Sequence, residues 1–539
     1  MKNGKTFQTL LSLLLVFVLL LTACGGGAIS ESESASESLS ESETPTESES
    51  ESESESESES ESLPITNANP SPTPSTDRTA YTYVDNGEPI GTGIGVNAGR
   101  VAWAHEVGAF DWDGTGYWWL EKNFDSDLVR AMVEETICSL AGKDNVNDAL
   151  DTIFTEHNLR VNGVERGYTK GQKITIKGNF NTTGTSLNSA ASAKGYFPAP
   201  VTVRAILQIL VEWGVAPEDI TVFDATRVIP TYMQEMCSEG ELQGVKFEYA
   251  GAFRYAEGAE AIWSYDFSQD EHPMDGQYST LNPAWYPTCV VEASYIINLF
   301  NMRGHSLAGF TASAKNHFGS VIPVIFEGNT VSYPQKFHSN PPCYNGLHRY
   351  VSTCDFNMGG IHWNLPKREM GTYNVLVDLM SNVNCGAKTV LYLCDALSAT
   401  MHQNSQMGLD CKWYSFGDGT AKGRQWTCSF FASQDPVAID SVMYDFVNAE
   451  LQAALAAGDN SWHNRNEPVL PVGNTATNYL IEAALAYDPP SGTYYQDGEG
   501  NLVTSLGVHE HWNNATDKQY SRNLGEDEGI ELVLVEVEK

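Results

Sequence analysis

Residues 200–214 read PVTVRAILQILVEWG, and after a short link residues 220–225 read ITVFDA; together they are the clearest indication of fold class in this chain. The first stretch predicts an apolar helix, because a proline stands near its start and a glycine at its end. The second predicts a short buried strand, because it is mostly apolar and rich in β-branched and aromatic residues. A helix that leads into a buried strand is typical of a parallel α/β sheet.

The same order of elements recurs further along the chain. Residues 373–383 have a helix-like pattern, Gly386 follows as a stop, and residues 389–396 read TVLYLCDA, again ending on Asp-Ala. We therefore expect an α/β fold with a mostly parallel sheet or sheets flanked by helices, arranged as two Rossmann-like subdomains. Open α/β sheets bind ligands beyond the carboxyl ends of their strands. This rule makes Asp224 and Asp395 candidate catalytic residues, although each is equally suited to capping the turn that follows it.

The first 23 residues predict a lipoprotein signal peptide. Lys2 and Lys5 precede an apolar run over residues 10–21, and residues 21–25 read LTACG. The run has the length of a signal-peptide core and is shorter than the roughly 20 residues that span a bilayer. We expect cleavage before Cys24 and lipidation of its thiol, which would anchor the protein on the outer face of the bacterial cytoplasmic membrane, at the cell surface. An uncleaved anchor helix is the alternative.

Residues 24–76 predict a disordered linker that carries no chemistry. Ser and Glu dominate residues 30–62, so like charges repel and there is no apolar surface to bury. Four prolines between residues 64 and 74 stiffen the rest. The linker suits a tether that holds a domain away from the membrane, and an unconstrained spacer explains it equally well. Residues 77–539 remain as a globular α/β region, long enough for a large core.

Composition narrows the range of partners and cofactors. The formal net charge is −38, and the chain stays strongly acidic when the 13 glutamates of residues 31–61 are set aside. Such a surface repels phosphate backbones, so we expect no nucleic-acid partner. Beyond Cys24 there are nine cysteines, and no C-x-x-C occurs among them. We therefore expect no iron–sulfur cluster, and the odd number leaves at least one thiol without a disulfide.

Four motifs in a fixed order resemble the domain of unknown function 362 family. Residues 167–181 (GYTKGQKITIKGNFN) are similar to its "GDKVLIKPN" opening, and the match continues through the expected helix at 200–213 and the strand at 220–224 (ITVFD). Residues 303–305 (RGH) with 314–319 (AKNHFG) are similar to its "K-x-H … KN-x-FG" stretch, and residues 432–440 (ASQDPVAID) to its "S-x-DPVAxD" segment. The series spans about residues 165–450, and the flanks resemble the secreted lipoprotein branch of that family. Many relatives carry a ferredoxin-like cysteine cluster, which this chain lacks, so an electron-transfer role is not implied.

Cationic side chains and a histidine are concentrated in the middle motifs. Arg303, His305 and Lys315 lie within 15 residues of one another in an otherwise acidic chain. Such a group suits the binding of an anion while a histidine moves a proton near neutral pH. Arg303 replaces the lysine of the family pattern, which excludes lysine-specific chemistry at that position. Pairing with surface carboxylates is the structural alternative for this group.

A second cluster follows the first motif. In an extended segment over residues 174–181, Lys177, Asn179 and Asn181 share one face, because side chains of a strand alternate. A lysine and two amides at a strand end are suited to holding a carboxylate or phosphate, and a self-satisfied loop is the alternative. We predict as catalytic Arg303, His305, Lys315, Asp224 and Asp395, and as substrate-binding Lys177, Asn179, Asn181, Asn316 and His317.

Two further features have weaker chemical implications. His509 and His511 flank Glu510, and on a strand both imidazoles would point to the same side and suit a divalent transition metal. Asp435 suits the N-cap of a helix that begins at Pro436 and ends before Gly458. The glycine-rich residues 91–95 do not follow a convincing strand or open a helix, so we do not expect a dinucleotide fingerprint there.

These features favour a surface-anchored protein that acts on a small anionic molecule, and they do not settle whether it is an enzyme. Our first hypothesis is proton-transfer chemistry on an anionic substrate, with or without a metal. A non-catalytic lipoprotein that binds a ligand for uptake is the alternative. A serine hydrolase that uses Ser306 is a third, because residues 304–308 (GHSLA) nearly fit the G-x-S-x-G elbow.

Overall fold

The computed structural model describes residues 88–181, 196–249, 255–266, 284–305, 307–323, 325–327, 330–332, 347, 349–353, 356–357, 364–365, 367–400, 413, 426–458 and 475–537. All of them belong to the unit Ser71–Lys539. The predicted signal peptide, Cys24, the linker up to residue 76 and Ser306 lie outside the described residues. Within these ranges no helix has the length and hydropathy needed to cross a membrane.

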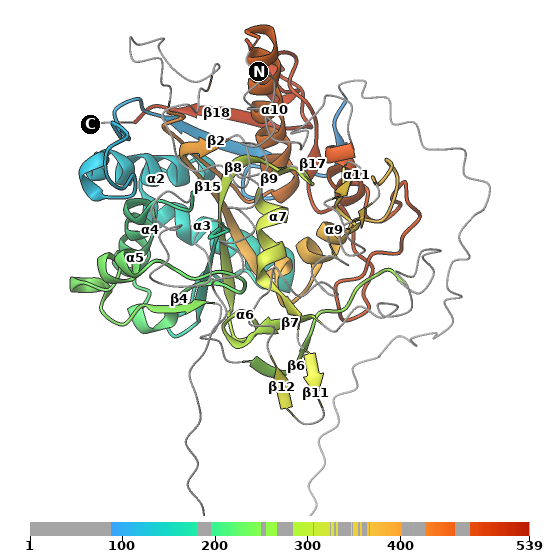
Figure 1. Cartoon of the computed structure of the whole chain (residues 1–539), viewed down its shortest axis with the longest axis horizontal. Helices are drawn as coiled ribbons and strands as arrows, with labels where there is room; N and C mark the ends of the chain where they lie inside the picture. Colours follow the sequence, from blue (N-terminus) through green and yellow to red (C-terminus); the bar gives the residue numbers. More distant parts are fainter. Residues whose placement is uncertain are drawn as a thin grey trace, which may run out of the picture. The chain divides into compact units, whose positions relative to one another are not determined.

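A mixed sheet of nine strands organises the described residues (Figure 1). In spatial order its strands are β18 (Glu531–Val535), β2 (Arg100–His105), β16 (Ser429–Ser433), β15 (Thr389–Thr400), β8 (Tyr295–His305), β3 (Ile174–Gly178), β4 (Ile220–Asp224) and β5 (Lys246–Tyr249), with β9 (Gly309–Thr311) paired to β8. The run from β15 to β5 is parallel throughout. β16 is antiparallel to both of its neighbours, and β18 is parallel to β2. The predicted α/β fold with a mostly parallel sheet is confirmed.

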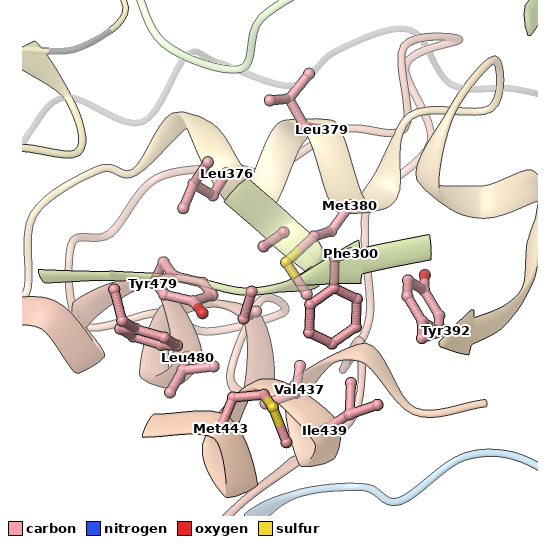
Figure 2. Close-up of a cluster of buried hydrophobic side chains, with 14 of the residues drawn as sticks. Phe300, Leu376, Leu379, Met380, Tyr392, Val437, Ile439, Met443, Tyr479 and Leu480 are labelled. Carbon is pink, nitrogen blue, oxygen red and sulfur yellow. The ribbon is translucent and has the colours of Figure 1, made fainter. Parts of the chain in front are cut away.

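Helices cover both faces of this sheet. One face packs against α2 (Ser126–Ala141), α3 (Val146–Asn162), α4 (Pro200–Trp213) and α5 (Thr231–Met236), and the other against α7 (Ser313–His317), α9 (Val375–Ser381), α10 (Pro436–Ala456) and α11 (Asn478–Ala484). Strand side chains alternate between the two cores: along β8, Ile297 and Leu299 belong to the first, and Ile296 and Phe300 to the second. Figure 2 shows the second core, where Phe300 lies among Met380 of α9, Met443 of α10 and other apolar side chains.

The two predicted helix–strand units lie in this one sheet, not in separate sheets. α4 precedes β4 as expected, and Gly214 ends α4 with a φ of 113°. In the second unit α9 is shorter than predicted, because the Asn374 side chain caps its start by accepting from the Leu376 N–H. β8 and β3 lie between β15 and β4 and pair with them, which joins the two units into one layer.

Short elements surround the main sheet. They are β1 (Ile90–Gly91) paired with β17 (Val508–His509), a three-stranded sheet of β10 (Ile322–Pro323), β7 (Ala284–Pro287) and β6 (Tyr255–Glu260), the pairs β11 (Ile325–Glu327) with β12 (Thr330–Ser332) and β13 (Phe356–Asn357) with β14 (Asn364–Leu365), and the one-turn helix α6 (Thr288–Val291). The six described cysteines, Cys138, Cys237, Cys289, Cys385, Cys394 and Cys428, are buried and form no disulfide.

Asp435 connects three segments that are far apart in the sequence. Its carboxylate accepts the N–H groups of Val437 and Ala438, at 3.0 and 2.8 Å, which is the predicted cap of α10. It also accepts the N–H of Ile94 at 3.0 Å and that of Val508 at 3.2 Å. The glycine-rich loop and β17 are therefore held against the start of α10 by a single buried side chain.

Removing this carboxylate should destabilise the fold. In Asp435→Ala four N–H groups lose their acceptor, three of them buried and that of Ile94 partly buried. One orphaned buried group alone costs about 1–3 kcal/mol. We expect the free energy of unfolding, measured by urea denaturation, to fall by at least about 3 kcal/mol. The control Asp127→Ala, at an exposed position of α2, should change it by less than about 0.5 kcal/mol. Equal stability of the two variants would contradict this assignment.

Candidate functional site

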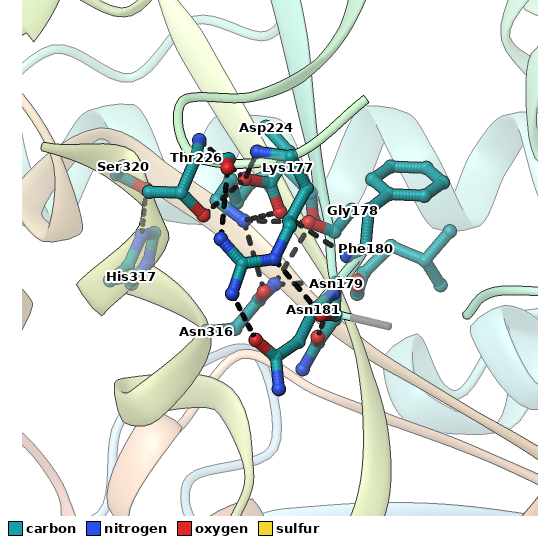
Figure 3. A network of polar contacts seen from close by, with 12 residues as sticks. Lys177, Gly178, Asn179, Phe180, Asn181, Asp224, Thr226, Asn316, His317 and Ser320 are labelled. Carbon is teal, nitrogen blue, oxygen red and sulfur yellow. Dashed lines mark hydrogen bonds and ion pairs between the residues drawn. The ribbon is translucent and has the colours of Figure 1, made fainter. Parts of the chain in front are cut away.

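A buried ion pair between Lys177 and Asp224 lies at the carboxyl ends of β3 and β4 (Figure 3). Lys177 Nζ is 3.1 Å from Asp224 Oδ2, 2.6 Å from the Gly178 carbonyl oxygen and 3.1 Å from Asn316 Oδ1. An ammonium group has three protons, and these three acceptors use all of them. Burial lowers the pKa of Lys177, and the Asp224 charge opposes that shift. Lys177 thus holds the site together and has no proton left to donate to a ligand.

Asp224 also fixes the two loops that border the site. Its Oδ2 accepts the N–H of Phe180 at 3.2 Å. Its Oδ1 accepts the N–H and hydroxyl of Thr226, at 2.8 and 2.9 Å, and the N–H of Arg227 at 3.1 Å. Asp224 therefore caps the turn after its strand, as the structural alternative predicted, and it lines the site as well.

The short helix α7 places its residues against this ion pair. The N–H groups of Ser313 and Ala314 donate to Asp440 of α10, at 2.7 and 3.0 Å, which fixes the start of α7. The Asn316 amide nitrogen donates to the Lys177 carbonyl oxygen at 3.1 Å and to Asn298 Oδ1 at 2.7 Å. Lys315 precedes Asn316 in α7 and therefore lies close to the same ion pair.

Arg303 of β8 is buried with donors that no described residue accepts. Its Nη2 donates to Asn179 Oδ1 at 2.5 Å, and its guanidinium lies 5.7 Å from the ring centre of Tyr196. Its Nε and Nη1 have no partner, although the residue is only 1% exposed. Burial is the main reason why the pKa of Arg303 is lowered to about 10. Unused donors on a buried cation indicate room for an anionic acceptor.

Lys315 is a second buried cation for which the described residues provide no hydrogen-bond acceptor. Its Nζ lies 3.9 Å from the ring centre of Phe318. Burial, followed by the charges of Arg303, Arg227 and Lys177, lowers the pKa of Lys315 to about 7. At neutral pH a large fraction of this side chain is therefore an uncharged amine, which can accept a proton.

His305 is held in one orientation by the backbone. Its Nδ1 accepts the N–H groups of Leu307 and Ala308, both at 3.1 Å. In the neutral imidazole the proton must then be on Nε2, so His305 presents a donor at that nitrogen. The predicted role of proton acceptor therefore suits Lys315 better than His305.

These side chains line one small cavity of about 40 Å³ at the carboxyl ends of β3, β4 and β8. Among the described lining residues the cations are Lys177, Arg303 and Lys315, and the one carboxylate is Asp224. The cavity therefore has an excess of positive charge within an acidic protein. The remaining lining residues are Asn179, Asn181, Thr226, His305, Thr311, Asn316, Phe318 and Gly319.

Two predicted residues lie outside the cavity. His317 faces away from it and contacts Cys385 Sγ at 3.1 Å and Thr389 Oγ1 at 3.2 Å, and burial lowers its pKa to about 3. Asp395 accepts the N–H of Ala199, just before α4, at 2.6 Å, and that of Leu397 at 3.2 Å. Asp395 thus has the capping role that was its structural alternative, and burial raises its pKa to about 6.

The two histidines proposed as metal ligands lie beside α10. His509 Nδ1 is 2.8 Å from Ser441 Oγ, and His511 Nδ1 is 2.6 Å from Asp445 Oδ1. The two ring centres are 4.8 Å apart. In the ranges that the structure describes, no three His, Cys, Asp or Glu residues are grouped as metal ligands.

Sequence reasoning missed Arg227 and Tyr196. Arg227 donates from Nε to the Asn181 carbonyl oxygen at 2.9 Å and from Nη2 to Asn181 Oδ1 at 2.8 Å. Its position three residues after Asp224, at the end of β4, was the signal that could have found it. Nothing local identifies Tyr196, which reaches Arg303 from a separate segment.

The lowered pKa of Lys315 predicts a specific dependence of stability on pH. In the unfolded chain a lysine titrates near 10.4, so between about pH 7 and pH 10 the unfolded state binds one more proton than the folded state. The contribution of Lys315 to stability therefore rises with pH in this window, by about 1.4 kcal/mol per unit. Lys315→Met should stabilise the protein most near pH 6–7, and this gain should shrink towards pH 10.

Urea denaturation at several pH values measures this gain. The control Lys143→Met, at an exposed position after α2, should give a difference from wild type that does not vary with pH. If the difference in the free energy of unfolding between Lys315→Met and wild type also stays constant from pH 6 to pH 10, the Lys315 amine is charged throughout this range and its pKa is not lowered.

Comparison with known protein families matches residues 174–445 to the family described as Domain of unknown function (DUF362). The match covers just over half of the 539 residues and includes the whole cavity from Lys177 to Gly319. It confirms the resemblance that the four motifs predicted. A search of curated proteins found no match. On the extent of the family match, this chain belongs to the DUF362 family.

Proposed function

We propose that the mature protein is anchored through lipid on Cys24 to the outer face of the bacterial cytoplasmic membrane and that its cavity binds a small anionic molecule. In this proposal Lys315 exchanges a proton with the bound molecule, so that the protein is a small-molecule enzyme. The observation that carries it is the unbalanced positive charge of the cavity, where Arg303 and Lys315 have no anionic partner among the described residues.

The charge imbalance supports an anionic ligand over a neutral one. A buried cation without a counter-ion is unfavourable, and an anion that enters the cavity removes this penalty for both side chains. Hydrogen bonds between charged groups are about twice as strong as neutral ones. Asp224 does not compete for the ligand's position, because its two oxygens already accept hydrogen bonds from Lys177 and from both neighbouring loops.

The arrangement also supports proton transfer. The uncharged Lys315 amine would accept a proton from the bound molecule, and the resulting ammonium would be stabilised by the ligand's negative charge. Arg303 would hold the anionic group through its two nitrogens that have no partner among the described residues. Each of these side chains is fixed by contacts with the protein, as pre-organised catalysis requires.

A binding protein without catalysis is the second candidate. Arg303 is 1% and Lys315 9% exposed, so the ligand's charged group would be enclosed, which favours retention. The two candidates share the anion site and differ in turnover. In the enzyme, Lys315→Met should abolish turnover and leave the Arg303 contact intact; in the binder, no anion that binds should be converted.

Anion binding tests the shared claim. We expect calorimetry with inorganic phosphate and with pyruvate to detect binding of at least one of them near pH 7. Arg303→Gln should weaken that binding by about tenfold or more, because it removes a charged donor. Arg130→Gln, on the exposed side of α2, is the matched control and should bind as wild type does. Unchanged affinity in Arg303→Gln would exclude this cavity as the anion site.

Location is tested separately in the native bacterium. Wild-type protein should partition into the detergent phase of a Triton X-114 extract, because several acyl chains on Cys24 anchor it stably. Cys24→Ser should move to the aqueous phase if it is secreted, or remain as the uncleaved precursor. Detergent partitioning of a processed Cys24→Ser protein would contradict the lipid anchor.

A further inference from the structure

We propose that the ligand of this cavity is a small 2-oxo acid, whose carbonyl carbon condenses with the Lys315 amine to form an imine while Arg303 holds its carboxylate. This inference rests on the proposed anion-binding function and adds to it the chemical class of the substrate and the bond that forms.

The two lysines of the cavity have opposite environments. Lys177 donates to three acceptors, among them the Asp224 carboxylate, and these contacts favour its charged form. Lys315 has no acceptor among the described residues, lies on the face of the Phe318 ring, and is surrounded by the charges of Lys177, Arg227 and Arg303. Only an uncharged amine has the lone pair that attacks a carbonyl, and a lysine beside other cations in a dry site is the environment that provides one. The lowered pKa of Lys315 supports this assignment.

Among the described residues, the ionisable groups nearest Lys315 are engaged by other partners. His305 on β8 has its Nδ1 occupied by two backbone N–H groups. Asp224 on β4 is saturated by its own contacts, and Asp440 on α10 accepts the two N–H groups at the start of α7 and the Tyr479 hydroxyl. Asp378 on α9, which packs against α7, is bonded to Ser264 and Tyr373.

The neighbouring groups match the rest of a 2-oxo acid. Arg303 offers two nitrogens without partners to a carboxylate. The cavity is small, about 40 Å³, which suits a short oxo acid.

The step is balanced without an oxidant or reductant. The amine lone pair forms a carbon–nitrogen bond to the carbonyl carbon, and the carbonyl oxygen takes a proton to become a hydroxyl. That first proton comes from the nitrogen. The hydroxyl then takes the second hydrogen of the nitrogen and leaves as water, while the nitrogen lone pair forms the carbon–nitrogen double bond. Once its nitrogen is protonated, the imine accepts the electron pair that is left when a proton leaves the carbon next to the former carbonyl carbon.

Reductive trapping tests the inference on the wild-type protein. The purified mature protein is incubated with pyruvate near pH 7, treated with sodium borohydride, digested and examined by mass spectrometry. We expect a reduced pyruvyl adduct at Lys315 that exceeds the adducts at Lys177 and at the exposed Lys143 by at least about tenfold. Acetone, which has the carbonyl but no carboxylate, should give far less adduct, and Arg303→Gln should reduce trapping of pyruvate.

Two outcomes separate this inference from the function on which it rests. If calorimetry detects pyruvate or phosphate and borohydride leaves Lys315 no more modified than Lys143, the imine is overturned and the anion site stands. If neither anion binds, the proposed function and the inference fail together. Lys315→Arg keeps a cation in the cavity and serves as the covalent control: it should bind phosphate and yield no adduct at position 315.

Discussion

The ion pair between Lys177 and Asp224 is the interaction on which the site depends. Two buried charges are tolerated only when hydrogen bonds satisfy them, and here those bonds reach β3, β4, the loops after both strands, and α7. Gly319 belongs to the same arrangement, because a Cβ atom at that position would lie 3.1 Å from Lys177 Nζ. The pair neutralises itself, so the charge that remains in the cavity comes from Arg303 and from the protonated fraction of Lys315.

The contrast between the two lysines explains how one acidic protein produces a local excess of positive charge. The two lysines differ in their partners: Lys177 has a carboxylate and two further acceptors, whereas burial and neighbouring cations lower the pKa of Lys315 to about 7. Active sites commonly separate the pKa values of neighbouring groups in this way. Buried cations without a counter-ion lower the stability of the protein when no ligand is bound. This cost indicates that these side chains serve a function and not the stability of the fold.

The sequence predicted the features that depend on local pattern. Periodicity and the glycine stop located α4 and the strand β4 that follows it, and the rule for strand ends pointed to Asp224, which lines the cavity, and to Asp395, which does not. Residues in α7 show where this reasoning stops. Lys315 and Asn316 face the cavity, while the adjacent His317 faces Cys385. Successive residues of a helix point in directions about 100° apart. The orientation of a one-turn helix is set by tertiary contacts, here by the Asp440 carboxylate that accepts the N–H groups at its start. Tyr196 beneath Arg303, and the capping role of Asp395, depend on distant segments and have no local signal.

The most direct test of the central claim is an anomalous-scattering crystal structure of the mature protein grown with selenate, a tetrahedral anion that selenium makes visible. The account predicts an anomalous peak in the cavity, within hydrogen-bonding distance of Arg303 and of Lys315 Nζ, and loss of that peak in Arg303→Gln crystals. A cavity without selenate, in which Arg303 Nε and Nη1 are bonded to a carboxylate of the protein itself, would contradict it.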